Sequence, residues 1–73
     1  MSQPDNKTLD VQRIRAFIEA RGDSEVSVED IMEHSGAERL RVYPILFEME
    51  QASWLEVTSE GELGAPVSVR RRQ

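Results

Sequence analysis

The apolar residues of this chain change their spacing once, and that change limits the possible folds more than any other feature of the sequence. Over residues 8–52 most of them recur at intervals of three and four, which is the period of an amphipathic helix. Over residues 54–70 the spacing shortens, and Val67-Ser68-Val69-Arg70 alternates strictly, as in a strand with one buried face. The sequence therefore predicts helices followed by a small sheet, which is an α+β fold.

Two helices are expected in the first half of the chain. The first covers residues 8–21 and ends at Gly22, because a glycine commonly follows the last turn of a helix. The second is about two turns long. Ser27 followed three residues later by Asp30 resembles a helix-start capping arrangement, and Gly36 supplies the stop.

A third helix is expected from about residue 39 to residue 52, a stretch without glycine in which apolar residues again recur at helical spacing. Pro44 is its irregularity. A proline inside a helix removes the bond to the carbonyl four residues earlier, here that of Leu40, and disfavours helical geometry at Tyr43. The helix therefore either begins late or bends near Tyr43.

Short strands are expected at three places. Val26-Ser27-Val28 is β-prone and precedes the second helix, while residues 54–58 and 67–70 are longer runs rich in aromatic or β-branched residues. Residues 59–66 between the longer runs contain two glycines and a proline, which is turn chemistry. The last two strands are therefore expected to form an antiparallel hairpin.

The length of 73 residues is enough for one small domain with a thin core, which leaves little room for an enzyme cleft. We expect a disordered tail at residues 1–7, a folded domain at residues 8–70 and a basic tail at residues 71–73. The absence of cysteine excludes disulfides and thiolate metal sites. No stretch approaches the ~20 apolar residues of a membrane span, so we expect a cytoplasmic protein that does not bind membranes.

The order helix, short strand, helix, turn, helix and hairpin resembles a winged helix-turn-helix domain over residues 8–70, with three helices and a small antiparallel sheet. The segment Val42-Tyr43-Pro44-Ile45-Leu46-Phe47-Glu48-Met49-Glu50, followed by Trp54-Leu55, is similar to the Tyr-Pro-x-Leu-x-x-Leu-Glu pattern of PadR-type transcriptional regulators. It departs from that pattern at Met49, which replaces a leucine, at Ser53, where a glycine is typical, and at Phe47, where a polar residue is usual. The long C-terminal helix with which those regulators dimerise does not follow the hairpin.

This resemblance implies a DNA-binding transcriptional regulator, in which the third helix enters the major groove and the hairpin, or wing, touches the DNA backbone. Arginine suits guanine edges and phosphates, and glutamine suits adenine. The candidate DNA contacts are Arg39, Arg41, Gln51, Arg70, Arg71 and Arg72. The run of three arginines has a second interpretation, a solvated tail.

The distribution of charge favours a different function. The chain has 9 basic and 14 acidic side chains, a net charge of −5, and residues 24–36 contain four carboxylates and no Lys or Arg. A second helix with this charge repels DNA, and the wing adds Glu60 and Glu62. The alternative is therefore a non-enzymatic protein-interaction module, whose partner contacts the acidic second helix and the apolar edge of the third.

That apolar edge consists of Leu40, Tyr43 and Phe47, which lie three and four residues apart beside the core-facing residues of the third helix. We expect the first helix and the hairpin to cover this stripe, as happens for a helix buried in a small core. The alternative is that the stripe is the interface of a homodimer or of a complex with another protein.

The remaining candidate residues indicate no catalysis, metal, cofactor or small-molecule ligand. His34 is the only histidine and stands beside Glu33, without a cysteine or second histidine to complete a metal site. Ser27 and Ser35 are explained by capping and turn roles and have no base partner. Trp54 is expected to plug the core where hairpin and helices meet, because no Lys or Arg stands next to it in the sequence.

Overall fold

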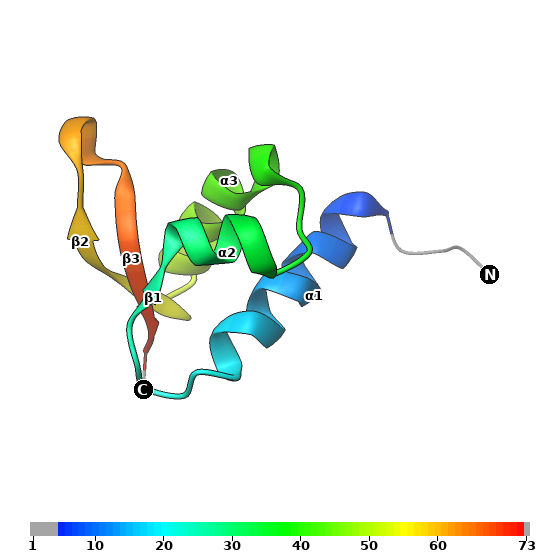
Figure 1. Ribbon diagram of the computed structural model, residues 1–73, viewed down its shortest axis with the longest axis horizontal. Helices are drawn as coiled ribbons and strands as arrows, with labels where there is room; N and C mark the ends of the chain where they lie inside the picture. The colour runs from blue at the N-terminus through cyan, green and yellow to red at the C-terminus, as the bar shows by residue number, and fades with distance from the viewer. Residues whose placement is uncertain (1–4, 73) are drawn as a thin grey trace.

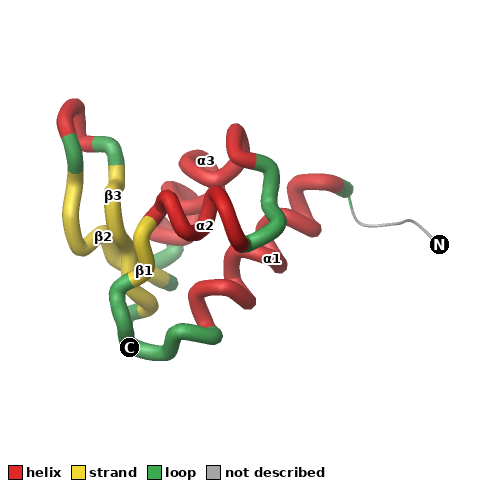
Figure 2. Tube along the Cα trace, viewed as in Figure 1, coloured by secondary structure: helices red, strands yellow, loops and turns green. Residues whose placement is uncertain are grey.

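The computed structural model describes residues 5–72, in which three α-helices pack beside a small antiparallel sheet (Figure 1). In chain order the elements are α1 (Asn6–Glu19), β1 (Val26–Ser27), α2 (Val28–His34), α3 (Arg39–Gln51), β2 (Leu55–Glu60) and β3 (Pro66–Arg71). Figure 2 shows the helices gathered on one side of the hairpin of β2 and β3. The predicted α+β class is confirmed, and the layout is compatible with that of a winged helix. Within residues 5–72, no helix is long and apolar enough to cross a membrane.

Regular structure extends further at both ends than predicted. α1 begins two residues early, because the Asp5 carboxylate accepts a hydrogen bond of 2.7 Å from the Thr8 N–H and so caps the helix. At the other end, β3 includes Arg71. Parts of both expected tails therefore belong to a helix or a strand, while residues 1–4 and Gln73 lie outside the described residues.

The stop and start signals of the first two helices act much as predicted. α1 ends at Glu19, two residues before its predicted end at residue 21, and Gly22 adopts a φ of +60° in the turn that follows. α2 starts where the Ser27 hydroxyl accepts a hydrogen bond of 3.0 Å from the Asp30 N–H, which confirms the capping. Gly36 adopts a φ of +86° two residues after α2, in the left-handed region that favours glycine.

α3 runs through its proline. It begins at Arg39 and contains Pro44, so the alternative of a late start is wrong. Pro44 has no N–H to give to the carbonyl of Leu40, but the side chain of Leu40 lies in solvent and water can take the place of that donor.

The C-terminus of α3 is closed by a left-handed residue. Ser53 has a φ of +61° and donates its N–H to the Glu50 carbonyl at 2.9 Å, while the Trp54 N–H reaches the Met49 carbonyl at 2.9 Å. These two bonds form a Schellman motif, in which glycine is the usual left-handed residue. Ser53 is thus a serine in a backbone conformation that glycine usually adopts.

The sheet has the order β1-β3-β2, and both pairings are antiparallel. The predicted hairpin of the last two strands is confirmed, and β1 adds a short third strand to its inner part. The register shifts after the pair Val57 and Val69, because Thr58 has no partner before Ser59 pairs with Ser68. Beyond that bulge the hairpin continues alone to a one-turn 3-10 helix at its tip, Glu62–Gly64.

The core lies where the inner faces of the helices meet the sheet. Val42, Leu46 and Met49 of α3, which were predicted to face inward, are buried. The other buried apolar residues are Ile14, Ile18, Val26, Val28, Ile31, Ala37, Ile45, Leu55 and Val69. Since α1 contributes its isoleucines to this cluster, it covers the inner side of α3 and leaves the outer side free.

Candidate functional site

The outward side of α3 is apolar and open to solvent. Leu40 is 83% exposed, Phe47 is 61% exposed and Tyr43 is 44% exposed. The prediction that the first helix and the hairpin cover this stripe is therefore wrong for Leu40 and Phe47. α1 packs on the opposite side of α3, and the hairpin reaches only far enough to form grooves beside Tyr43.

The hairpin extends this apolar surface. Val67 of β3 is half exposed, and Leu63 at the hairpin tip is fully exposed. Leu63 also has a φ of +65°, the left-handed region, which costs a residue with a Cβ about 1 kcal/mol. We call Leu40, Tyr43, Phe47, Leu63 and Val67 together the apolar face.

Two grooves cross the apolar face. The first, of about 330 Å³, lies between α3 and the hairpin. It is lined by Tyr43, Leu46, Phe47, Glu50, Val57, Glu60, Gly64 and Pro66. The second, also of about 330 Å³, lies toward the start of α2. It is lined by Ser27, Val28, Glu29, Met32, Arg39, Tyr43, Pro66 and Val67. Tyr43 and Pro66 line both grooves and separate them.

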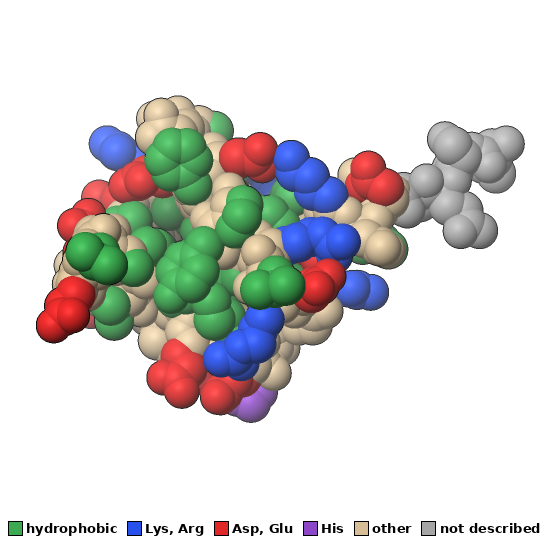
Figure 3. All heavy atoms as spheres, turned by 90° about the horizontal axis from the view of Figure 1, so that it is seen from above, with side chains coloured by type: hydrophobic (Ala, Val, Ile, Leu, Met, Phe, Trp, Pro, Cys, Tyr) green, Lys and Arg blue, Asp and Glu red, His purple; other side chains and the backbone are tan. Residues whose placement is uncertain are grey.

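The charged groups that line the two grooves are mostly acidic. Glu50 and Glu60 line the first groove, and Glu29 and Arg39 line the second. We call the three glutamates the acidic rim. Figure 3 shows the face on which α3 and the hairpin tip lie uppermost in Figure 1: hydrophobic side chains occupy the middle, acidic side chains lie at the left and lower edges, and Lys and Arg side chains adjoin the middle on the right and below.

Arg41, the candidate for guanine contact, is engaged within the domain. One guanidinium nitrogen lies 3.0 Å from a carboxylate oxygen of Asp10 and 2.8 Å from one of Glu38. This nitrogen is therefore engaged with two carboxylates, one of which is buried, and the engagement restricts how the guanidinium can turn toward a base.

The arginines at the end of the hairpin are either engaged within the domain or exposed far from the hairpin tip. Arg70 forms an ion pair with Glu56, with 3.0 Å between Nε and the carboxylate oxygen, and this pairing raises the pKa of Arg70. Arg71 lies over the ring of Trp54, and Arg72 is exposed. Arg70 and Arg71 are the last residues of β3 and Arg72 follows them, so all three lie near the C-terminus, at the opposite end of the hairpin from its tip (Figure 1).

The two remaining candidates for DNA contact, Arg39 and Gln51, are exposed on α3. They are the first and last residues of the helix, so about 18 Å of helix axis separates them at 1.5 Å per residue. Between them the outward side carries Leu40, Tyr43 and Phe47. The structure therefore does not bring the predicted DNA contacts together on one surface.

Asp10 is a buried carboxylate that the sequence analysis missed. It accepts hydrogen bonds from Arg41 at 3.0 Å, from the Glu38 N–H at 3.3 Å and from Arg13 at 3.4 Å. Burial raises the pKa of Asp10, but these bonds and the two guanidinium charges outweigh it, so the pKa lies below its ordinary value. The spacing of four from Asp10 to Ile14 placed it on the core-facing side of the helix and was the signal for it.

Trp54 also differs from its prediction. It packs partly against the core, but two arginines distant in sequence lie over its ring, Arg15 at 5.1 Å and Arg71 at 4.5 Å from the centroid. A groove of about 370 Å³ beside it is lined by Trp54, Arg15 and residues of α3. These cation–π contacts hold the end of β3 and the start of β2 to α1.

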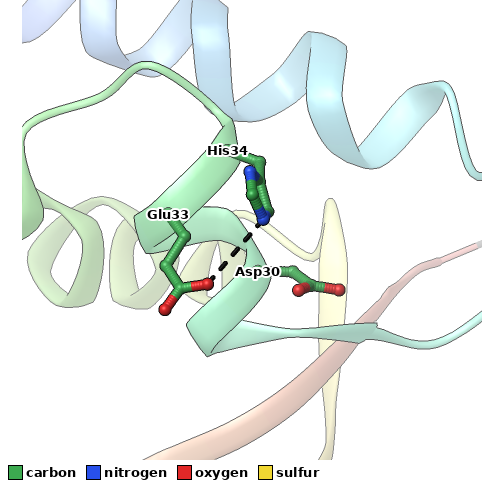
Figure 4. A group of neighbouring side chains, drawn as sticks. All are labelled: Asp30, Glu33 and His34. Carbon is green, nitrogen blue, oxygen red and sulfur yellow. Dashed lines mark ion pairs between the residues drawn. The ribbon is translucent and has the colours of Figure 1, made fainter.

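Three exposed side chains of α2 lie close enough together to be considered as metal ligands. Asp30, Glu33 and His34 each offer one atom within 4.8 Å of the others (Figure 4). His34 lies 3.7 Å from Glu33, and Figure 4 shows these two turned toward each other while Asp30 points away. An exposed pair between a histidine and a glutamate accounts for this arrangement without a metal.

A group of hydroxyls joins β2 and β3. Ser68 lies 2.6 Å from Thr58 and 2.7 Å from Ser59, and its hydroxyl donates to Glu25 at 3.2 Å. Hydrogen bonds from Thr58 and Ser68 lower the pKa of Glu25. Ser68 of β3 thus links Thr58 and Ser59 of β2 to Glu25, the residue before β1.

No family model, curated protein or solved structure matches this chain. The apolar face and the acidic rim adjoin each other along the two grooves. Both lie on the same side of α3, and both are formed jointly by helices and hairpin.

Proposed function

We propose that this chain is a winged helix that acts as a non-enzymatic protein-interaction module, with the apolar face as its docking surface. The single observation that carries this proposal is the exposure of Leu40, Tyr43 and Phe47 along the outward side of α3. Contiguous exposed apolar and aromatic side chains of this kind mark interaction sites in proteins, and aromatic residues are frequent binding anchors.

The order of elements supports the winged-helix part of the proposal. Three helices precede a hairpin, α2 and α3 are joined by a short turn, and β1 pairs with the second strand of the hairpin. In winged-helix domains that bind DNA, the outward side of the third helix and the hairpin, or wing, are the surfaces that meet the DNA. The apolar face lies on those two elements.

DNA binding by the same surface is the competing proposal, and it is supported less well. A helix that enters the major groove needs side chains that reach base edges and phosphates. Here the middle of the outward side is apolar, Arg41 is held by Asp10 and Glu38, and the rim is acidic. The exposed Arg39 is the feature that favours DNA.

The proposal is tested by selecting binders from a random peptide library on the immobilised full chain. Each selected peptide is then titrated against the wild type, Phe47→Ser and Gln12→Ser. Phe47→Ser removes an aromatic anchor from the apolar face, and Gln12→Ser is a matched control at an exposed helical position of α1.

We expect selected peptides to lose about tenfold or more in affinity with Phe47→Ser, as at a binding hot spot, and to keep it with Gln12→Ser. Selected peptides whose affinity is unchanged by Phe47→Ser would bind outside the apolar face and contradict the proposal. An empty selection, together with salt-sensitive binding of duplex DNA that depends on Arg39, would favour the regulator instead.

A further inference from the structure

Resting on the proposed function, we infer that the partner presents a cationic amphipathic segment to the apolar face, with apolar side chains in the two grooves and Lys or Arg against the acidic rim. The partner is thus defined by its chemistry, as a basic and amphipathic stretch of another protein. Three independent features of the surface lead to it.

The first feature is the shape of the apolar face. The two grooves lie on either side of Tyr43 and Pro66, and each has an apolar floor, with Leu46 and Val57 in one and Val28 and Met32 in the other. A segment laid across this ridge can place one apolar side chain in each groove. A recurring way of binding an amphipathic helix is to receive spaced apolar anchors of this kind in a hydrophobic groove.

The second feature is the charge of the acidic rim. Glu50 and Glu60 flank the first groove and Glu29 the second, and among the described residues none of the three forms an ion pair. Arg39 is the one cation that lines either groove, so the carboxylates outnumber it. Such a surface attracts a basic segment and repels an acidic one.

The same charge argues against a second copy of this chain as the occupant. A two-fold dimer places the same patch of both copies in contact. Such a contact brings together three glutamates and one arginine from each copy, and each copy carries a net charge of −5. Like charges in contact disfavour that pairing, so a partner of opposite charge fits better.

The third feature is Leu63 at the tip of the hairpin. It is fully exposed and holds a left-handed backbone conformation that asparagine or glycine adopts more easily. Within the domain, the side chain therefore gains no burial in return for an unfavourable conformation. Folding of the domain does not explain a leucine at this position, whereas contact with an apolar residue of the partner does.

Two synthetic peptides of matched length test the inference with the full chain. One is an amphipathic helix of leucine and lysine, and the other has every lysine replaced by glutamate. Each is titrated by calorimetry and by amide chemical-shift mapping, at low and at high salt. The variants are Glu50→Gln with Glu60→Gln, and a control pair with the same change in net charge outside both grooves, Glu19→Gln with Glu33→Gln.

We expect the lysine peptide to bind, to shift the amide signals of Tyr43, Phe47 and Leu63, and to bind more weakly at high salt. Glu50→Gln with Glu60→Gln removes two carboxylates that face lysines of the peptide, and we expect this double variant to lower affinity by about tenfold. The control double variant is expected to change affinity by about twofold or less. The glutamate peptide is expected to bind more weakly by about tenfold or more.

Three results overturn the inference. Equal binding of both peptides, abolished by Phe47→Ser, removes the charge selectivity while the proposed function stands. Failure of both peptides, with self-association of the wild type that Phe47→Ser abolishes in sedimentation, assigns the apolar face to a second copy. Failure of both peptides without self-association overturns the inference, and with an empty library selection it overturns the proposed function as well.

Discussion

Arg41 of α3 donates a hydrogen bond of 3.0 Å to the buried carboxylate of Asp10 on α1, 31 residues earlier in the chain. The same carboxylate accepts from the Glu38 N–H just before α3, so Asp10 also serves the start of a helix whose N-cap makes no side-chain cap bond of its own. This link fixes the start of α3 against α1. The same link engages within the domain an arginine for which the sequence pattern predicted DNA contact.

Replacing Asp10 by asparagine is expected to destabilise the domain by about 2 kcal/mol, because the hydrogen bonds from charged Arg41 and Arg13 lose their ionic partner. Urea unfolding measures the change in the free energy of unfolding. The control is Glu19→Gln at an exposed position, for which a change within about 0.5 kcal/mol is expected. Equal stability of Asp10→Asn and the wild type would show that the link does not stabilise the fold.

The stability of the domain is expected to fall as the pH drops below about 4. The pKa of Asp10 in the folded state lies below its unfolded value of about 3.9, so the unfolded chain binds more protons in this range. The stabilisation is present above the unfolded pKa and is lost as the pH falls through the folded pKa. Asp5 and Glu25 are shifted in the same direction.

Asp10→Asn provides the control for this pH dependence. The variant lacks the group that titrates, so its unfolding free energy is expected to decline less steeply between about pH 5 and pH 2 than that of the wild type. Unfolding in urea at a series of pH values gives both curves. Parallel curves would mean that Asp10 does not contribute to the acid sensitivity.

Ser53→Gly is expected to stabilise the domain by about 0.5–1 kcal/mol, because Ser53 holds a φ of +61° that glycine adopts without strain. The serine lies at the end of α3, away from the lining of both grooves. Peptide binding is therefore expected to stay unchanged. Ser53→Ala, which keeps a Cβ, is the control that should show no gain in the midpoint of thermal unfolding.

Leu63→Asn is expected to raise stability and lower binding together. Asparagine is enriched in the left-handed region, so relief of the φ of +65° adds about 0.5–1 kcal/mol to the free energy of unfolding. Loss of an exposed apolar side chain from the apolar face is expected to weaken the leucine–lysine peptide several-fold. If Leu63→Asn binds this peptide as tightly as the wild type does, Leu63 is not part of the docking surface.

Much of the fold was predictable from local sequence signals. The helical spacing of Val42, Leu46 and Met49 identified the inward side of α3, and Ser27 identified the start of α2. The alternation around Val69 identified the hairpin. Each of these signals acts within a few residues, which is why the sequence alone carries it.

The properties of the surface were less predictable, because they depend on contacts between distant segments. Whether Phe47 is covered depends on which side of α3 receives α1, and whether Arg41 is free depends on a carboxylate in another helix. Likewise Trp54 has no basic neighbour in sequence, yet Arg15 and Arg71 lie over its ring. Such pairings are decided only when the elements pack together.

The most direct test of the central claim is one titration series in which the leucine–lysine peptide and a mixed-sequence DNA duplex are added separately to wild type, Phe47→Ser and Arg39→Ala at low salt. We predict that the peptide binds the wild type and Arg39→Ala but not Phe47→Ser, and that the duplex does not bind at ~100 μM protein, where typical non-specific DNA-binding proteins do. Binding of the duplex that weakens with salt and with Arg39→Ala, but not with Phe47→Ser, would contradict the account and identify a DNA-binding surface.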